Sequence, residues 1–272
     1  MKSVITRRQF LHRNLGAIFA ATAAPAMVSP AVLAQQGAAA PNSRIQVGCI
    51  GVGPQGRGVM SNFLAQNDCR VVAVCDVAKR NLNEALNQVN QKYEDHACAT
   101  YHRYEELLER KDIDAVLIAS PDHWHVGMSI DAALAGKDIY LEKPMGLSVA
   151  EDQLLRKTVR KEKRIFQFGT QQRSSSQFRQ ACELVRSGKI GPLKNINVWC
   201  SASRPGGTTA PVPVPPDLDY ERWLGPAPDS PYTVDKCFDV SIPDAWKTWW
   251  YNYDYALRSE ERRVGKECRS RW

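Results

Sequence analysis

Short apolar runs alternate with longer amphipathic stretches between residues 44 and 168, and this alternation predicts the secondary structure. Runs of the kind buried in parallel sheets predict strands at residues 44–50, 70–75, 114–119, 138–141 and 165–168. Helical patterns lie between them, ending at Leu64 and spanning residues 81–93, 104–110, 124–135 and 148–163. The last of these helices opens with a capping box, Ser148 and Glu151. The order predicts an α/β fold with a doubly wound parallel sheet.

The pattern changes after Arg173, which predicts a second domain. Residues 178–187 form a helical stretch that ends at Gly188, and the alternation at 193–200 predicts the first strand of an antiparallel sheet. We expect residues 44–173 to form the first domain and residues 174–257 an incomplete α+β domain. This domain also contains a group of aromatic residues, Trp246, Trp249, Trp250 and Tyr251. We expect them to be buried, and stacking on a sugar ring is the alternative.

A glycine motif follows the first predicted strand directly. Gly51-Val52-Gly53-Pro54-Gln55-Gly56 matches GxGxxG and stands where a strand turns into a helix. In a Rossmann fold Gly51 permits the tight turn, Gly53 lets a pyrophosphate approach, and Gly56 lets the helix pack closely. The motif predicts a dinucleotide site, and a purely structural glycine turn is the alternative.

An acidic residue closes the second predicted strand. Asp76 follows the last glycine by the spacing expected of the carboxylate that binds the adenosine ribose. It would accept hydrogen bonds from the 2′-hydroxyl and repel a 2′-phosphate, which favours NAD. Lys79 and Arg80 stand nearby, so NADP is the alternative cofactor.

The net charge of +7 would raise the question of a nucleic acid or membrane partner. The excess lies at the ends, because residues 1–34 carry four basic and no acidic side chains and residues 258–272 carry six basic and three acidic. Residues 35–257 are therefore neutral, and we predict no nucleic-acid partner.

The candidate metal ligands are too few for a metal site. The eight cysteines form no CxxC pair, and sequence does not assign a disulfide. Asp122, His123 and His125 invite a metal hypothesis, but two closely spaced imidazoles on a loop lack a third ligand. We predict no bound metal.

Three loops that follow predicted strands carry residues that resemble one protein family. They are Ser120-Pro121-Asp122-His123-Trp124-His125, Glu142-Lys143-Pro144 and Gly169-Thr170-Gln171-Gln172-Arg173. With the glycine motif, they resemble the Gfo/Idh/MocA oxidoreductases over residues 44–257. The resemblance implies a Rossmann domain that binds NAD, hydride transfer to or from a sugar or cyclitol, and homo-oligomers of the full-length protein.

The resemblance also assigns the site residues. Lys143 would act on the substrate hydroxyl as the catalytic group, and Lys143 and Arg173 would bind substrate. The motif and the resemblance together imply these cofactor contacts: Gly51, Gly53, Pro54, Gln55, Gly56, Asp76, Ser120, Pro121, His125, Glu142, Lys143 and Gln171. The Asp and His that the family uses as acid and base have no counterpart here. The alternatives are an NAD-dependent glycosidase and a non-catalytic nucleotide-binding protein.

The two ends of the chain do not belong to the predicted fold. Arg7 and Arg8, the apolar run 15–28 and the small-residue exit at Ala34 resemble a twin-arginine (Tat) signal over residues 1–34. A linker at 35–43 would follow, and export by the Tat translocase would place the protein in the periplasm. Residues 258–272 resemble a translated sequencing adapter, so we expect a C-terminally truncated and inactive fragment.

Overall fold

A computed structural model describes residues 43–197 and 210–234, with the separate positions 236, 249, 252 and 254–256. The chain divides into two compact units, Met1–Arg44 and Ile45–Trp272, and the second is described below. The predicted signal peptide, nearly all of the linker and the adapter-like tail lie outside the described residues.

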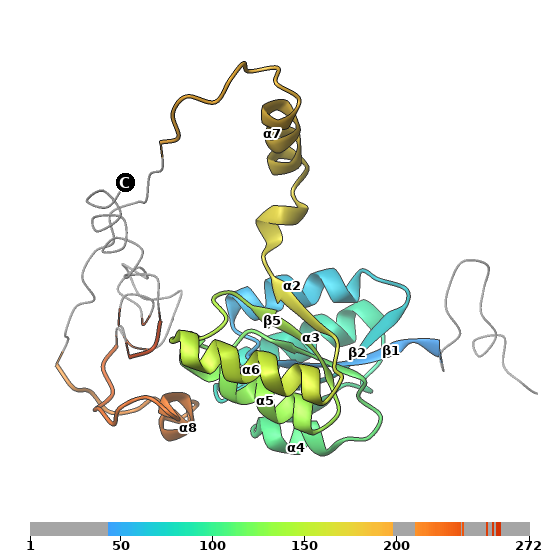
Figure 1. Cartoon of the computed structure of the whole chain (residues 1–272). Coiled ribbons are helices and arrows are strands. Elements are labelled where there is room, and N and C mark those ends of the chain that lie inside the picture. The colour runs from blue at the N-terminus through green and yellow to red at the C-terminus, as the bar shows by residue number, and fades with distance from the viewer. Residues whose placement is uncertain are drawn as a thin grey trace, which may run out of the picture. The chain divides into compact units, whose positions relative to one another are not determined.

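A six-stranded parallel sheet forms the centre of the second unit (Figure 1). Its strands are β1 (Ile45–Ile50), β2 (Cys69–Cys75), β3 (Ala99–Tyr101), β4 (Ala115–Ile118), β5 (Asp138–Glu142) and β6 (Phe166–Gly169). They lie in the order β3-β2-β1-β4-β5-β6, which is the doubly wound Rossmann order. The predicted fold class is confirmed. The sequence patterns missed β3, which is only three residues long and has no fully buried residue.

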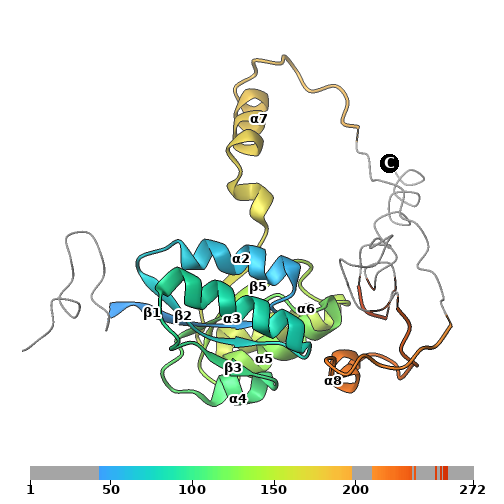
Figure 2. The same cartoon turned by 180° about the vertical axis from the view of Figure 1, so that it is seen from behind.

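Helices cover both faces of the sheet (Figures 1 and 2). The helices α2 (Pro54–Leu64) and α3 (Lys79–Tyr93) pack on one face, where Met60 and Val89 are buried with Val71. On the other face lie α4 (Tyr104–Glu109), α5 (His125–Leu134) and α6 (Val149–Lys161). Burial from both sides explains why β4 (AVLI) and most of β2 are apolar without alternation.

Local signals set the helix ends much as predicted. The hydroxyl of Ser148 accepts a hydrogen bond of 3.3 Å from the Glu151 amide, so the N-terminal cap of α6 is confirmed. Gly136 has a φ of +79° just after α5, a conformation that glycine adopts without strain. No helix among the described residues is long and apolar enough to cross a membrane.

The described part of the second predicted domain starts with α7 (Ser176–Arg186), none of whose residues is buried. The strand predicted at 193–200 is not observed, because residues 193–197 have no regular structure and 198–200 lie outside the described residues. A strand requires a hydrogen-bonded partner, and none pairs with residues 193–197 in the part of the chain that is described.

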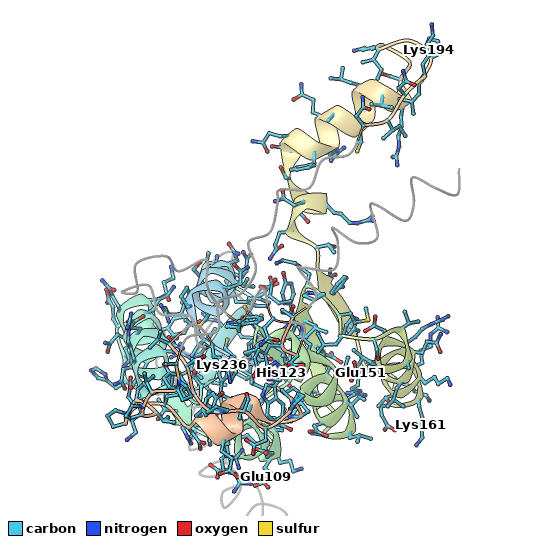
Figure 3. All side chains as sticks on the ribbon, turned by 90° about the vertical axis from the view of Figure 1, so that its left-hand side faces the viewer. Glu109, His123, Glu151, Lys161, Lys194 and Lys236 are labelled. Carbon is cyan, nitrogen blue, oxygen red and sulfur yellow. The ribbon has the colours of Figure 1, made fainter. Side chains whose placement is uncertain are left out.

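A short helix, α8 (Tyr220–Leu224), is the centre of a separate aromatic cluster. Trp223, Tyr232 and Tyr255 are buried in it, and Trp249 packs against it. In Figure 3 the labelled His123 and Lys236 lie beside this helix. Trp249 is partly buried against this cluster and also lines the cavity described below, so its position does not decide between the two predicted uses, and Trp246, Trp250 and Tyr251 lie outside the described residues.

Candidate functional site: a cavity at the carboxyl ends of the strands

The glycine loop has the geometry that its motif predicts. Gly51 has a φ of +76°, and a Cβ on Gly56 would lie 2.0 Å from the carbonyl oxygen of Gly51. Both positions therefore exclude a side chain. At Gly53 the nearest atom to an added Cβ is the Asn81 amide nitrogen, 3.8 Å away, so this backbone is open on the side that faces α3.

The carboxylate of Asp76 ties the glycine loop to the end of β2. Its Oδ2 accepts the Val52 N–H at 2.9 Å, and its Oδ1 accepts the Ala78 N–H at 2.9 Å and the Asn81 amide at 3.4 Å. Burial raises the pKa of Asp76, and these hydrogen bonds oppose that rise. A carboxylate has about four acceptor positions, so the position left for a ribose hydroxyl is on Oδ2.

Ser120, in the loop after β4, and His125, the first residue of α5, lie close to the glycine loop and to each other. The hydroxyl of Ser120 is buried and, among the described residues, has no hydrogen-bond partner. The ring of His125 is 1% exposed, with Nε2 at 2.9 Å from the Ser120 carbonyl and Nδ1 at 2.5 Å from the Pro144 carbonyl. Burial lowers the pKa of His125 to about 4. His125 therefore lies between the backbones of two strand-end loops, and the neutral ring, which has one N–H, donates a hydrogen bond to one of the two carbonyls and contacts the other.

The loop after β5 holds Glu142 and Lys143. Glu142 is 3% exposed and accepts hydrogen bonds from the Gln171 amide and from the Lys143 N–H at 3.2 Å. Its carboxylate therefore connects the ends of β5 and β6. The Lys143–Pro144 peptide bond is cis.

A single cavity of about 380 Å³ joins these loops. This volume lies within the range of about 300–1,000 Å³ that small-molecule sites occupy. The predicted site residues that line it are Gly51, Gly53, Pro54, Gln55, Gly56, Asp76, Ser120, Pro121, His125, Glu142 and Lys143. Gln171 and Arg173 are exposed and do not line it, so the cofactor contact predicted for Gln171 and the substrate contact predicted for Arg173 gain no support from their positions.

Other lining residues escaped the sequence analysis. Asn81 lies in the first turn of α3, and His102 directly follows β3, the strand that the sequence patterns missed, so neither was marked by a predicted strand end. Leu218, Arg222 and Trp223 come from a distant part of the chain, and no local pattern marks them.

The cavity suits a dinucleotide on three independent grounds. No side chain caps the amino-terminal end of α2, and its first turn carries no acidic residue, so its N–H groups and positive dipole end suit a phosphate. Gly53 leaves room for close approach to the backbone. The unpartnered Ser120 hydroxyl is available to a ligand atom.

His123 is part of the packing between the loop after β4 and α8. Its Nε2 lies 3.0 Å from the Trp223 carbonyl and its Nδ1 lies 3.4 Å from the Tyr255 carbonyl. Burial lowers its pKa. Across the described residues, no group of three histidine, cysteine, aspartate or glutamate side chains has the arrangement of a metal site.

The strand order is that of a Rossmann domain, and the cavity lies where such a domain binds a dinucleotide. The model of the Gfo/Idh/MocA family, described as an oxidoreductase family with an NAD-binding Rossmann fold, matches residues 45–170. Residues 45–170 are therefore similar to the NAD-binding Rossmann domain of that family.

Individual relatives come from two kinds of enzyme. Glycosyl hydrolase family 109 protein 2 from Shewanella sp. (strain ANA-3) is 36% identical over 110 residues, which are 39% of this chain and 24% of that protein. Myo-inositol 2-dehydrogenase from Thermotoga maritima is 29% identical over 182 residues, 66% of this chain and 49% of that protein. The crystal structure of myo-inositol 2-dehydrogenase from Lactobacillus plantarum has a TM-score of 0.49 and 28% identity, covering 54% of this chain and 42% of that one. The chain thus spans a quarter to a half of the length of the curated relatives it matches.

Proposed function

We propose that the chain is the cofactor-binding part of an enzyme that transfers hydride between NAD and a hydroxyl-bearing carbon of a sugar or cyclitol. The observation that carries the proposal is the cavity that runs from the glycine loop to Lys143. NAD, when bound there, supplies the hydride acceptor or donor. The 29% identity to a myo-inositol 2-dehydrogenase supports the substrate class.

The residues of the cavity have distinct roles in this proposal. The N–H groups at the start of α2 bind the pyrophosphate, and the remaining acceptor position of Asp76 takes a ribose hydroxyl. His125 and Glu142 hold the loop of Lys143 in place through their backbone contacts. The Lys143 amine donates a hydrogen bond to the substrate oxygen and orients the carbon that loses hydride.

Calorimetric titration of the chain with NAD tests the proposed function. We expect binding by the unaltered chain and at least about tenfold weaker binding by Gly53→Ala, whose methyl group stands where the pyrophosphate approaches. Gly58→Ala is the control, because a Cβ there meets nothing within 4 Å. The unfolding temperature of Gly53→Ala should stay unchanged. Failure of the unaltered chain to bind NAD would refute the proposal.

An NAD-dependent glycosidase is the second candidate. The 36% identity to a family 109 glycosyl hydrolase over 110 residues favours it. In that reaction a sugar carbon is oxidised and then reduced again, so no NADH accumulates. Incubation with NAD and an aryl glycoside separates the two candidates: release of the phenol without net NADH indicates the glycosidase, and NADH formed from a free polyol indicates the dehydrogenase.

We also propose that the chain is exported to the periplasm through the Tat pathway. Arg7 and Arg8, followed by the apolar run 15–28 and small residues up to Ala34, support this route. Changing both arginines to lysine should leave an uncleaved precursor in the cytoplasm. Periplasmic recovery of the double variant in normal amounts would argue against Tat export.

A further inference from the structure

Residues 217–224, which we call the clasp, pair with the backbone directly after Asp76. The Lys79 N–H donates to the Asp217 carbonyl at 2.8 Å, and the Asp219 N–H donates to the Val77 carbonyl at 3.0 Å. Between them Ala78 and Leu218 form an antiparallel bridge. The clasp therefore lies along the loop that follows the proposed ribose carboxylate.

Polar contacts hold the clasp beside the end of β3 and the start of α4. The His102 Nε2 lies 3.0 Å from an Asp219 carboxylate oxygen, and the Arg222 Nη1 lies 3.4 Å from both oxygens of Glu105. The Nε of Arg222 is also 3.8 Å from the Asp219 carboxylate. Two carboxylates thus fix the orientation of the Arg222 guanidinium before any ligand binds.

Packing on the loop after β4 anchors the other end of the clasp. The Trp223 carbonyl accepts the Trp124 indole N–H at 3.0 Å and faces the His123 ring at 3.0 Å. Trp223 itself is 6% exposed within the aromatic cluster. Contacts at the ends of β2, β3 and β4 therefore keep the clasp over this edge of the sheet.

The clasp lines the dinucleotide cavity on the side of β2. Leu218 and Arg222 border the cavity together with Val77, Ala78 and His102. Lys143 borders it from the end of β5, three positions away from β2 in the sheet. A dinucleotide whose nicotinamide lies at Lys143 and whose ribose lies at Asp76 would place its adenine on the side of the clasp.

We propose that Leu218 and Arg222 form one wall of the adenine subsite, an inference that rests on the proposed binding of NAD. The apolar side chain of Leu218 suits the face of a purine, and a guanidinium stacks favourably on an aromatic ring. Both residues lie outside the matched domain, residues 45–170. The adenine subsite is therefore completed by a part of the chain that the Rossmann fold does not supply.

Binding of cofactor fragments tests the inference on the whole chain. The probes are NAD, ADP-ribose and nicotinamide mononucleotide, titrated into Leu218→Ala, Arg222→Ala and Arg222→Lys and followed by calorimetry. We expect Arg222→Ala to bind NAD and ADP-ribose about 3- to 30-fold more weakly, the range for a cation stacked on an aromatic face. Leu218→Ala should also bind both probes more weakly, because it loses apolar contact with the purine. The affinity of the two alanine variants for nicotinamide mononucleotide should not change, and Arg222→Lys should fall between Arg222→Ala and the unaltered chain.

Two matched variants control for loss of a leucine or an ion-paired arginine. Leu154 is 54% exposed on α6, and Arg179 pairs with Glu183 at 2.8 Å on α7, so Leu154→Ala and Arg179→Ala should bind as the unaltered chain does. Circular dichroism confirms that each variant is folded, and Leu218→Ala tests the wall without changing any charge.

The outcomes separate this inference from the proposed function. Unchanged ADP-ribose affinity in Leu218→Ala and Arg222→Ala, with NAD bound by the unaltered chain, overturns the adenine wall and leaves the proposed function standing. Equal weakening of ADP-ribose and nicotinamide mononucleotide also overturns it, since the clasp would then act on the whole cavity. Absence of NAD binding by the unaltered chain refutes the proposed function itself.

Discussion

His125→Asn tests how a buried imidazole controls the stability of the Rossmann domain in acid. Burial favours the neutral ring and lowers the pKa of His125 from its usual 6.5 to about 4, although the carbonyls of Pro144 and Ser120 oppose the shift. As the pH falls below 6.5 the unfolded chain binds a proton at this ring and the folded chain does not. The stability that neutral His125 provides is therefore complete above pH 6.5 and is lost between about pH 6.5 and pH 4.

The size of this loss follows from the two pKa values. The linkage relation gives a loss of about 2 kcal/mol at pH 5 and about 3 kcal/mol at pH 4. We expect His125→Asn to be less stable than the unaltered chain at pH 7.5. Because asparagine does not titrate, this difference in the free energy of unfolding shrinks by these amounts in acid. Other titrating groups, including His123, are common to both proteins and cancel.

Urea denaturation followed by tryptophan fluorescence at pH 7.5, 5 and 4 measures the difference. His96→Asn is the matched control, because it makes the same exchange at an exposed position. A difference that grows as the pH falls would refute the reasoning. It would mean that the folded ring is a cation, held by its two carbonyl contacts at 2.5 and 2.9 Å.

Three further predictions concern the glycine loop, the lysine and the clasp. Gly56→Ala should lower the free energy of unfolding by about 1–3 kcal/mol, because the added methyl group meets the Gly51 carbonyl. Gly58→Ala should raise it by about 0.5–1 kcal/mol, since a Cβ there meets no atom within 4 Å. Equal effects of the two variants in urea denaturation would contradict this. In the complete enzyme Lys143→Ala should lower kcat about 10²- to 10⁴-fold in steady-state assays, and full activity would remove Lys143 from the mechanism. Trp223→Ala should detach the clasp and speed tryptic cleavage after Arg222, and an unchanged cleavage rate would show that Trp223 does not anchor it.

Much of the fold was predictable because its signals are local. Continuous apolar strands and the hydrophobic faces of the helices repeat over a few residues, and the glycine motif marks the first turn. Strand β3 was missed because it is short, and its burial depends on β2 alone among the strands. The strand expected at 193–200 illustrates the opposite error, since alternation alone does not supply a partner strand.

The candidate site was predictable where it depends on strand ends. Parallel strands bring their carboxyl ends to one edge, so the motifs at Ser120 and Lys143 were expected to meet near the glycine loop. The sequence did not predict that Val52, Ala78 and Asn81 donate hydrogen bonds to the Asp76 carboxylate. These contacts depend on the path of the backbone. The clasp was missed because its pairing with residues 77–79 joins parts of the chain that are far apart in sequence.

The position of the clasp bears on how the site matures during synthesis. The ribosome adds about 5–20 residues per second, so the strands and the glycine loop emerge several seconds before Leu218 and Arg222. Until then, the side of the cavity next to Val77 and Ala78 lacks the contacts that the clasp provides. On the proposed assignment, a nascent chain that ends at Arg173 would capture the cofactor weakly, and tight retention would begin only when the clasp reaches the ends of β2 and β3.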